Sequence, residues 1–224
     1  MLEFTKDIRE AGLIYEEYGY VISAVPAKFG KINELALSLK GYKSSFPADK
    51  LNPKCSILLN HYLSKTVALD VDDYEKCFRI FKDFNIDLDE LIASTTTFQG
   101  QQNHYKLIYN RNFESNLGYK TIFSSDGEIL SFKGCDLCYD LTLDNADFIG
   151  NYLDHLPPSV NPPVTYMGGN TMPEIQYKFI TPLLRRDELP NMPSEVIDMW
   201  KNFDNLKERF NNIINFRDPA CASQ

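Results

Sequence analysis

The chain of 224 residues has no apolar run that approaches the roughly 18 residues needed to span a membrane. Its opening residues, 1–7, are charged and lack the apolar stretch of a secretory signal peptide. The chain also lacks repeats and low-complexity tracts. We therefore expect an intracellular protein with no membrane partner. Hydrophobic residues make up 43% of the chain and aromatic residues 13%, which is enough to build a folded core.

Several enzyme motifs are missing as well. There is no Walker phosphate loop, no Gly-x-Gly-x-x-Gly and no Gly-x-Ser-x-Gly, which argues against P-loop NTPases, dinucleotide oxidoreductases and α/β-hydrolases. The five cysteines are too few for a secreted disulfide scaffold. Cys135 and Cys138 have the spacing of half a zinc site, but no second close pair completes four ligands. We therefore expect reduced thiols and no zinc.

Positive charge is in deficit, with 23 Lys and Arg against 31 Asp and Glu, for a net charge of −8. This balance argues against a nonspecific nucleic-acid coat, which would be basic. It is compatible with an enzyme that binds nucleic acid through one local basic patch and uses several carboxylates to bind metal ions.

The hydrophobic pattern predicts a mixed α/β fold with local hairpins rather than repeated βαβ units. We expect helices over residues 3–18, 74–84, 87–92 and 194–216, the last with Ser194 as its N-cap. We expect strands over residues 20–25, 64–73, 94–98, 104–109, 120–124 and 129–132. Loops are expected over residues 40–55, 110–118 and 157–163, and a type I′ turn at Asp126-Gly127.

Asp70 and Asp72 are the sharpest chemical signal. Alternate residues of a strand share a face, so the two carboxylates should point the same way and repel each other. A divalent cation with oxygen ligands, Mg²⁺ or Mn²⁺, would relieve that repulsion. The alternative is that Asp72 or Asp73 only caps the following helix. If the two acids do repel each other, the loss of either one should not lower stability in metal-free buffer.

His104 begins the next expected hairpin strand, after a turn that contains Gly100 and Gln102. A histidine at that place could contact a phosphate or a sugar. The alternative is an ordinary half-buried histidine packed beside Tyr105 and Tyr109.

In their order along the chain, these features resemble the primase–polymerase (prim-pol) domain of the archaeo-eukaryotic primase superfamily. The resemblance covers roughly residues 8–170. It begins with Ala11, Tyr15, Tyr18-Gly19-Tyr20-Val21, Val25 and Gly30-Lys31. Asp70-Val71-Asp72 resembles the first motif, and Thr97, Gly100 and Gln102-Asn103-His104-Tyr105 resemble the second. Asp147, Gly150, Tyr152, Pro157-Pro158-Ser159 and Tyr166 resemble the third acidic motif and its trailing loop.

The resemblance implies a mainly antiparallel catalytic sheet, similar to that of RNA-recognition motifs, flanked by helices and preceded by an N-terminal α/β portion. It implies a catalytic domain over residues 1–182, with residues 183–224 as a helical C-terminal extension. Asp70, Asp72 and Asp147 would be the catalytic acids and would bind two Mg²⁺ or Mn²⁺ ions. Asp140, Glu128 and Asp126 are rivals for the third acid. His104, Gln102 and Lys106 would bind the nucleotide, with Arg111 as a further source of charge.

The implied function is a DNA-dependent primase or polymerase, which adds nucleotides from nucleoside triphosphates on a single-stranded DNA template. Candidate template contacts are Lys40, Lys43, Lys50, Lys54 and Lys65. A helicase partner would supply unwinding. Gln102 replaces a small residue of the family motif, and the arginine that often follows the third acid is missing. These departures leave open a degenerate nucleic-acid-binding or replication-initiation module, and clustered acids also suit a metal-dependent nuclease. The sequence leaves the choice between ribonucleotides and deoxyribonucleotides open.

Overall fold

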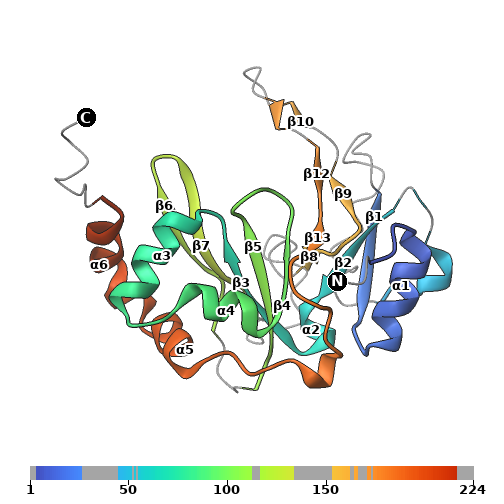
Figure 1. Cartoon of the computed structure of the whole chain (residues 1–224), viewed down its shortest axis with the longest axis horizontal. Coiled ribbons are helices and arrows are strands. Elements are labelled where there is room, and N and C mark those ends of the chain that lie inside the picture. Colours follow the sequence, from blue (N-terminus) through green and yellow to red (C-terminus); the bar gives the residue numbers. More distant parts are fainter. Residues whose placement is uncertain are drawn as a thin grey trace, which may run out of the picture.

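The computed structural model describes residues 4–26, 45–51, 53, 55–112, 117–133, 153–161, 164–165, 171–172 and 174–215. It confirms a mixed α and β architecture with antiparallel sheets (Figure 1). The α-helices are α1 (Ile8–Glu17), α2 (His61–Ser64), α3 (Tyr74–Asp83), α4 (Leu88–Ser94), α5 (Ser194–Lys201) and α6 (Phe203–Asn215). Two short 3₁₀ helices span Ala48–Lys50 and Arg186–Glu188.

The larger sheet has six strands in the order β13-β4-β5-β3-β7-β6. Its strands are β3 (Thr66–Val71), β4 (Thr96–Gln99), β5 (Tyr105–Asn110), β6 (Lys120–Ser124), β7 (Gly127–Lys133) and β13 (Lys178–Phe179). Strand β3 lies in the interior of the sheet and pairs antiparallel with β5 on one side and β7 on the other. Both expected hairpins are confirmed, because β4 pairs with β5 and β6 pairs with β7.

A smaller sheet of three strands has the order β1-β2-β8, formed by β1 (Ile22–Pro26), β2 (Cys55–Asn60) and β8 (Leu153–His155). Strands β2 and β8 were not expected from the sequence. Two further ladders join β9 (Val160–Asn161) to β12 (Ile175–Gln176) and β10 (Val164–Thr165) to β11 (Thr171–Met172). Strand β9 lies inside the segment that was expected to be only a loop, 157–163.

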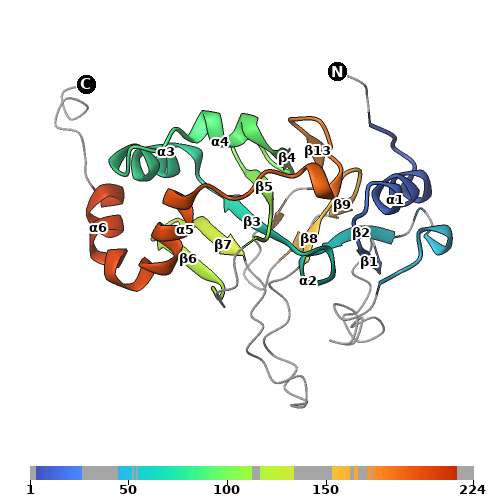
Figure 2. The same ribbon diagram turned by 90° about the horizontal axis from the view of Figure 1, so that it is seen from below.

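Side chains that alternate along β3 enter two different cores. Val67, Leu69 and Val71 join the core formed with helices α3 to α6, whereas Ala68 joins the core formed with α1, β1 and β2. Helices α3, α4, α5 and α6 gather around one end of the molecule, and α1 with the smaller sheet lies at the other end (Figure 2). Asp70 shares the strand face of Ala68 and therefore points away from the four helices.

The C-terminal segment differs from the single helix expected over 194–216. It forms α5 and α6, and the break falls at Asn202, whose side-chain amide donates to the Asp198 carbonyl over 2.9 Å. The break allows Trp200, Phe203 and Phe210 all to be buried in the core of the larger sheet. Ser194 is the first residue of α5 rather than its N-cap; Pro193 takes that position, without a side-chain hydrogen bond. The boundary after residue 182 stays a prediction.

The turn between β6 and β7 also differs from the expected type I′ turn. Ser124 pairs with Gly127, so the two central residues are Ser125 and Asp126, and neither has the positive φ that a type I′ turn requires. The left-handed backbone falls on Gly127, with φ of 136°. Among the described helices, none is long and apolar enough to cross a membrane.

Candidate functional site

Asp72 lies between residues of two neighbouring strands at one end of the larger sheet. In the register of β3, Val71 pairs with Tyr105 on β5 and with Leu130 on β7. His104 therefore flanks Asp72 on one side, with 3.5 Å between its Nδ1 and Asp72 Oδ1. On the other side the Asp72 amide donates to the Ile129 carbonyl over 2.8 Å, next to Glu128. The strand register thus brings together three candidate residues that are far apart in sequence.

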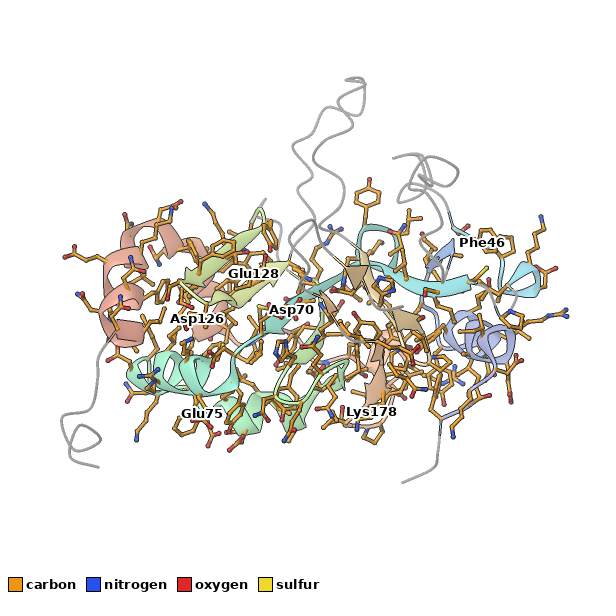
Figure 3. All side chains as sticks on the ribbon, turned by 90° about the horizontal axis from the view of Figure 1, so that it is seen from above. Phe46, Asp70, Glu75, Asp126, Glu128 and Lys178 are labelled. Atoms are coloured by element: carbon orange, nitrogen blue, oxygen red, sulfur yellow. The ribbon has the colours of Figure 1, made fainter. Side chains whose placement is uncertain are left out.

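Of the two acids that could cap the helix after β3, Asp72 and Asp73, it is Asp73 that does so. Its carboxylate is the N-cap of α3 and accepts from the Lys76 amide over 3.0 Å. Capping therefore occupies Asp73 and leaves Asp72 for another role. A pocket of about 310 Å³ opens beside Asp72 and is lined by Asp72, Asp73, Lys76, His104, Ser124, Asp126, Gly127 and Glu128. Figure 3 shows Asp126 and Glu128 on the same side of Asp70, on the β6–β7 hairpin.

The pocket is suited to a cation. Partial desolvation, followed by the negative charge of Asp72, raises the pKa of Glu128 above its ordinary value. The Oδ2 atom of Asp72 is buried without a hydrogen-bond partner, which leaves one carboxylate oxygen free to bind a ligand. Mg²⁺ and Mn²⁺ prefer such oxygen ligands, so Asp72 and Glu128 fit a divalent cation. Within the described residues, no three His, Cys, Asp or Glu side chains already stand close enough to form a complete metal site.

His104 is 40% exposed in its side chain and faces the pocket. The hydrogen bond to Asp72 raises the pKa of His104, and partial burial opposes this only in part. The raised pKa means that His104 contributes stability below its unfolded pKa of about 6.5, and this contribution is lost as the pH rises through the folded pKa. An imidazolium at the mouth of the pocket favours an anion nearby.

We expect Asp72→Asn to lower the pKa of His104 toward the ordinary value of about 6.5, because the substitution removes the charge that stabilises the imidazolium. Proton NMR titration of the imidazole signals in metal-free buffer measures this shift. His155 supplies an internal control, since burial lowers its pKa to about 4 and it has no contact with Asp72 among the described interactions. An unchanged His104 pKa in the variant would contradict the contact.

Asp70 has a different environment from Asp72. It is 4% exposed, and its Oδ2 atom binds the ammonium groups of both Lys106 on β5 and Lys133 on β7. Burial alone would raise the pKa of Asp70, but the two lysines hold it below its ordinary value. Asp70 and Asp72 therefore do not form an uncompensated repelling pair, so the premise of the expectation that an acid can be lost without a stability cost is wrong for Asp70.

Asp154 on β8 is the residue that the sequence analysis missed. Its Oδ1 atom lies 2.8 Å from Lys106 Nζ and 2.9 Å from Lys133 Nζ, and its Oδ2 lies 3.0 Å from His61 Nε2. Asp154 and His61 are both almost fully buried. The only sequence signal was an acid between Leu153 and His155, and nothing local to that segment indicated contact with β3.

The other predicted residues have four different outcomes. Gln102 is exposed in the turn before His104 and is not among the residues that line the pocket. Lys106, expected to bind nucleotide, contacts Asp70 and Asp154. Outside the described residues lie Asp147, Asp140, Cys135, Cys138, Lys40, Lys43 and Lys54. Asp126, a rival third acid, lies 3.3 Å from Lys76 Nζ at the pocket rim.

Comparison with known proteins does not assign the chain to a family. No protein-family model matches the chain, and no curated protein matches it at a significant level.

Proposed function

We propose that the protein has the primase–polymerase fold and is a nucleotidyltransferase that extends a strand on a single-stranded DNA template. The observation that carries the proposal is the position of Asp72, which directly follows the interior strand β3 and lies between His104, just before β5, and Glu128 of β7. Three acidic or basic groups, in or next to three adjacent antiparallel strands, line one pocket there. This is the kind of arrangement that positions a nucleotide and its metal ions.

Asp72 and Glu128 would hold a divalent cation in this proposal, with Asp70 as the neighbouring acid on the same strand. Such a cation, when bound, neutralises charge on the phosphates and lowers the pKa of the attacking hydroxyl. Glu128 takes the role of the third acid because it is the described rival that stands beside Asp72. Asp147 stays a prediction for that role, since it lies outside the described residues.

The chain's own residues would do the positioning. His104, held as an imidazolium by Asp72, is placed to donate to a phosphate oxygen or to the sugar of an incoming nucleotide. Lys76 also lines the pocket and adds a positive charge to it. Because phosphoryl transfer depends mainly on positioning and charge neutralisation, these groups are sufficient in kind for the reaction.

A second function is favoured by a specific observation. The two lysines bound to Asp70 supply positive charge where the resemblance expects a metal ion. A protein with that arrangement could bind nucleotides or nucleic acid and carry out no transfer. The degenerate binding module is therefore the competing proposal on the same fold.

A primer-extension assay on single-stranded DNA, with Mg²⁺ or Mn²⁺, tests the choice. Ribonucleotides and deoxyribonucleotides are supplied separately, with and without a primer. Longer strands support the transferase, shorter strands indicate a nuclease, and template binding without either product supports the binding module. Template affinity should fall steeply with salt in the first and third cases, because phosphate contacts release counterions.

A further inference from the structure

The β6–β7 hairpin contains an irregularity that decides which side chains reach the pocket. Ile122 pairs with Leu130. The next residue, Phe123, pairs with Glu128, so Ile129 is an extra residue on β7. Ile129 and Leu130 are consequently both buried in the core formed with helices α3 to α6. Such a bulge changes the direction of the side chains beyond it. Glu128, which regular alternation would turn toward that core, instead lines the pocket.

Phe123 lies beside Glu128 on the same face of the hairpin. Directly paired residues of antiparallel strands have their Cβ atoms about 5 Å apart on one face. Phe123 is 58% exposed, more than any other large hydrophobic residue in the described part of the chain. It makes no ring contact within that part, whereas the exposed ring of Phe78 stacks on Tyr74 with 6.1 Å between the centroids. The Phe123 ring is therefore available to a ligand.

The pocket next to Phe123 is polar and small. Its volume of about 310 Å³ is at the lower end of the range of about 300–1,000 Å³ for ligand pockets. Apart from Gly127, every residue that lines it has a polar or charged side chain. A space of this size and character suits phosphate groups with their cation and leaves the base of a nucleotide outside. Phe123 adjoins two of the lining residues, Ser124 in the chain and Glu128 across the hairpin.

We propose that Phe123 binds the base of the nucleotide by stacking, while the pocket holds the phosphates and their cation. The inference rests on the proposed function in one respect, namely that the pocket accepts the phosphates of a nucleotide. Every base has a π face, so stacking on an aromatic side chain tolerates any base. Phe123 has no hydrogen-bonding group that could select among bases. Such a contact suits a nucleotide whose identity is chosen by a template.

The acids around Phe123 make this contact depend on the cation. Glu128 lies opposite the ring and Asp126 lies in the turn of the same hairpin. Both carboxylates repel a polyphosphate chain unless a divalent cation lies between them and the phosphate oxygens. Stacking adds affinity only for the base, so its contribution can be measured separately from that of the phosphates.

Replacing Phe123 with alanine should weaken binding of the base alone. Isothermal titration calorimetry of the full chain with Mg²⁺ compares ATP and CTP with inorganic tripolyphosphate, which has no base. In Phe123→Ala the dissociation constant for ATP should rise about tenfold, within the range for base–aromatic stacking, and that for tripolyphosphate should not change. The wild type should prefer ATP to CTP because the purine ring is larger, and the variant should lose most of this preference.

Substitutions at the same position distinguish stacking from apolar bulk. Phe123→Trp should retain the wild-type affinity for ATP, whereas Phe123→Leu should not, because leucine has no π face. Phe78→Ala is the matched control, since Phe78 is a partly exposed aromatic residue of α3 outside the pocket lining. It should leave the constants for ATP and tripolyphosphate unchanged.

The outcomes separate the inference from the proposed function. No loss of affinity in Phe123→Ala, or equal losses for ATP and tripolyphosphate, would overturn the inference while the proposed function stands. A loss confined to single-stranded DNA would assign Phe123 to the template strand and would overturn the inference as well. Absence of binding of both ATP and tripolyphosphate to the wild type would overturn both.

Tryptophan fluorescence gives an answer that does not depend on the alanine variant. The chain has one tryptophan, Trp200, which is 1% exposed and donates to the Gly118 carbonyl over 2.8 Å. ATP should therefore quench the fluorescence of Phe123→Trp and leave that of the wild type unchanged. Tripolyphosphate should quench neither. Fluorescence of Phe123→Trp that does not respond to saturating ATP would overturn the inference.

Discussion

Replacing Asp70 with alanine should lower the free energy of unfolding by about 3–5 kcal/mol, the usual cost of breaking a buried ion pair from one side. The substitution leaves the ammonium groups of Lys106 and Lys133 with Asp154 as the one carboxylate of the cluster, so one positive charge is buried without compensation. For a chain of this size, that change corresponds to a fall of roughly 10 °C in melting temperature. Thermal and urea denaturation in metal-free buffer at neutral pH measure it.

A charge-balanced variant separates this explanation from a simple loss of packing. Asp70→Ala combined with Lys133→Met leaves one lysine with one carboxylate, so it should be more stable than Asp70→Ala alone. If packing were the cause, the second substitution would add its own cost instead. An Asp70→Ala protein within about 1 kcal/mol of the wild type would show that the lysines find water, as exposed ion pairs do.

The acidic strand and the histidine next to it could be predicted because their signals are local. Strand periodicity alone places Asp70 and Asp72 on one face, and the turn before His104 predicts the neighbouring hairpin strand. The structure confirms both elements. The alternation of side chains also places Lys106 of β5 on the same face as His104, which lies two residues earlier, just before the strand begins. Glu128 was already a candidate acid, on the strand that proved to be the other neighbour of β3.

The environment of Asp70 could not be predicted, because it depends on contacts between distant segments. Lys133 reaches Asp70 only through the pairing of β3 with β7, and Asp154 comes from β8 of the other sheet. Side chains that compensate a buried charge leave no periodic pattern in the sequence. Two adjacent acids on a strand therefore suggested mutual repulsion, although one of them is neutralised by lysines more than 30 residues away.

Asp70 and Asp72 should consequently respond differently to substitution. A substitution of Asp72 should test the proposed activity without a large change in stability. If the protein has the proposed function, Asp72→Asn should reduce nucleotide addition by about 1000-fold, since it would remove one of the carboxylates proposed to hold the cation, and such a contact is worth several kcal/mol. Its melting temperature should stay close to that of the wild type at a pH above the raised pKa of His104, because the imidazole is then neutral and the Oδ2 atom of Asp72 has no hydrogen-bond partner to lose. Asp73→Asn is the matched control: it makes the same chemical change one residue away, and asparagine caps a helix as well as aspartate does. Extension assays and thermal denaturation of both variants give the answer. Full activity in Asp72→Asn would remove the metal role from this residue, and equal losses in the two variants would mean that the acidity of the pocket matters as a whole.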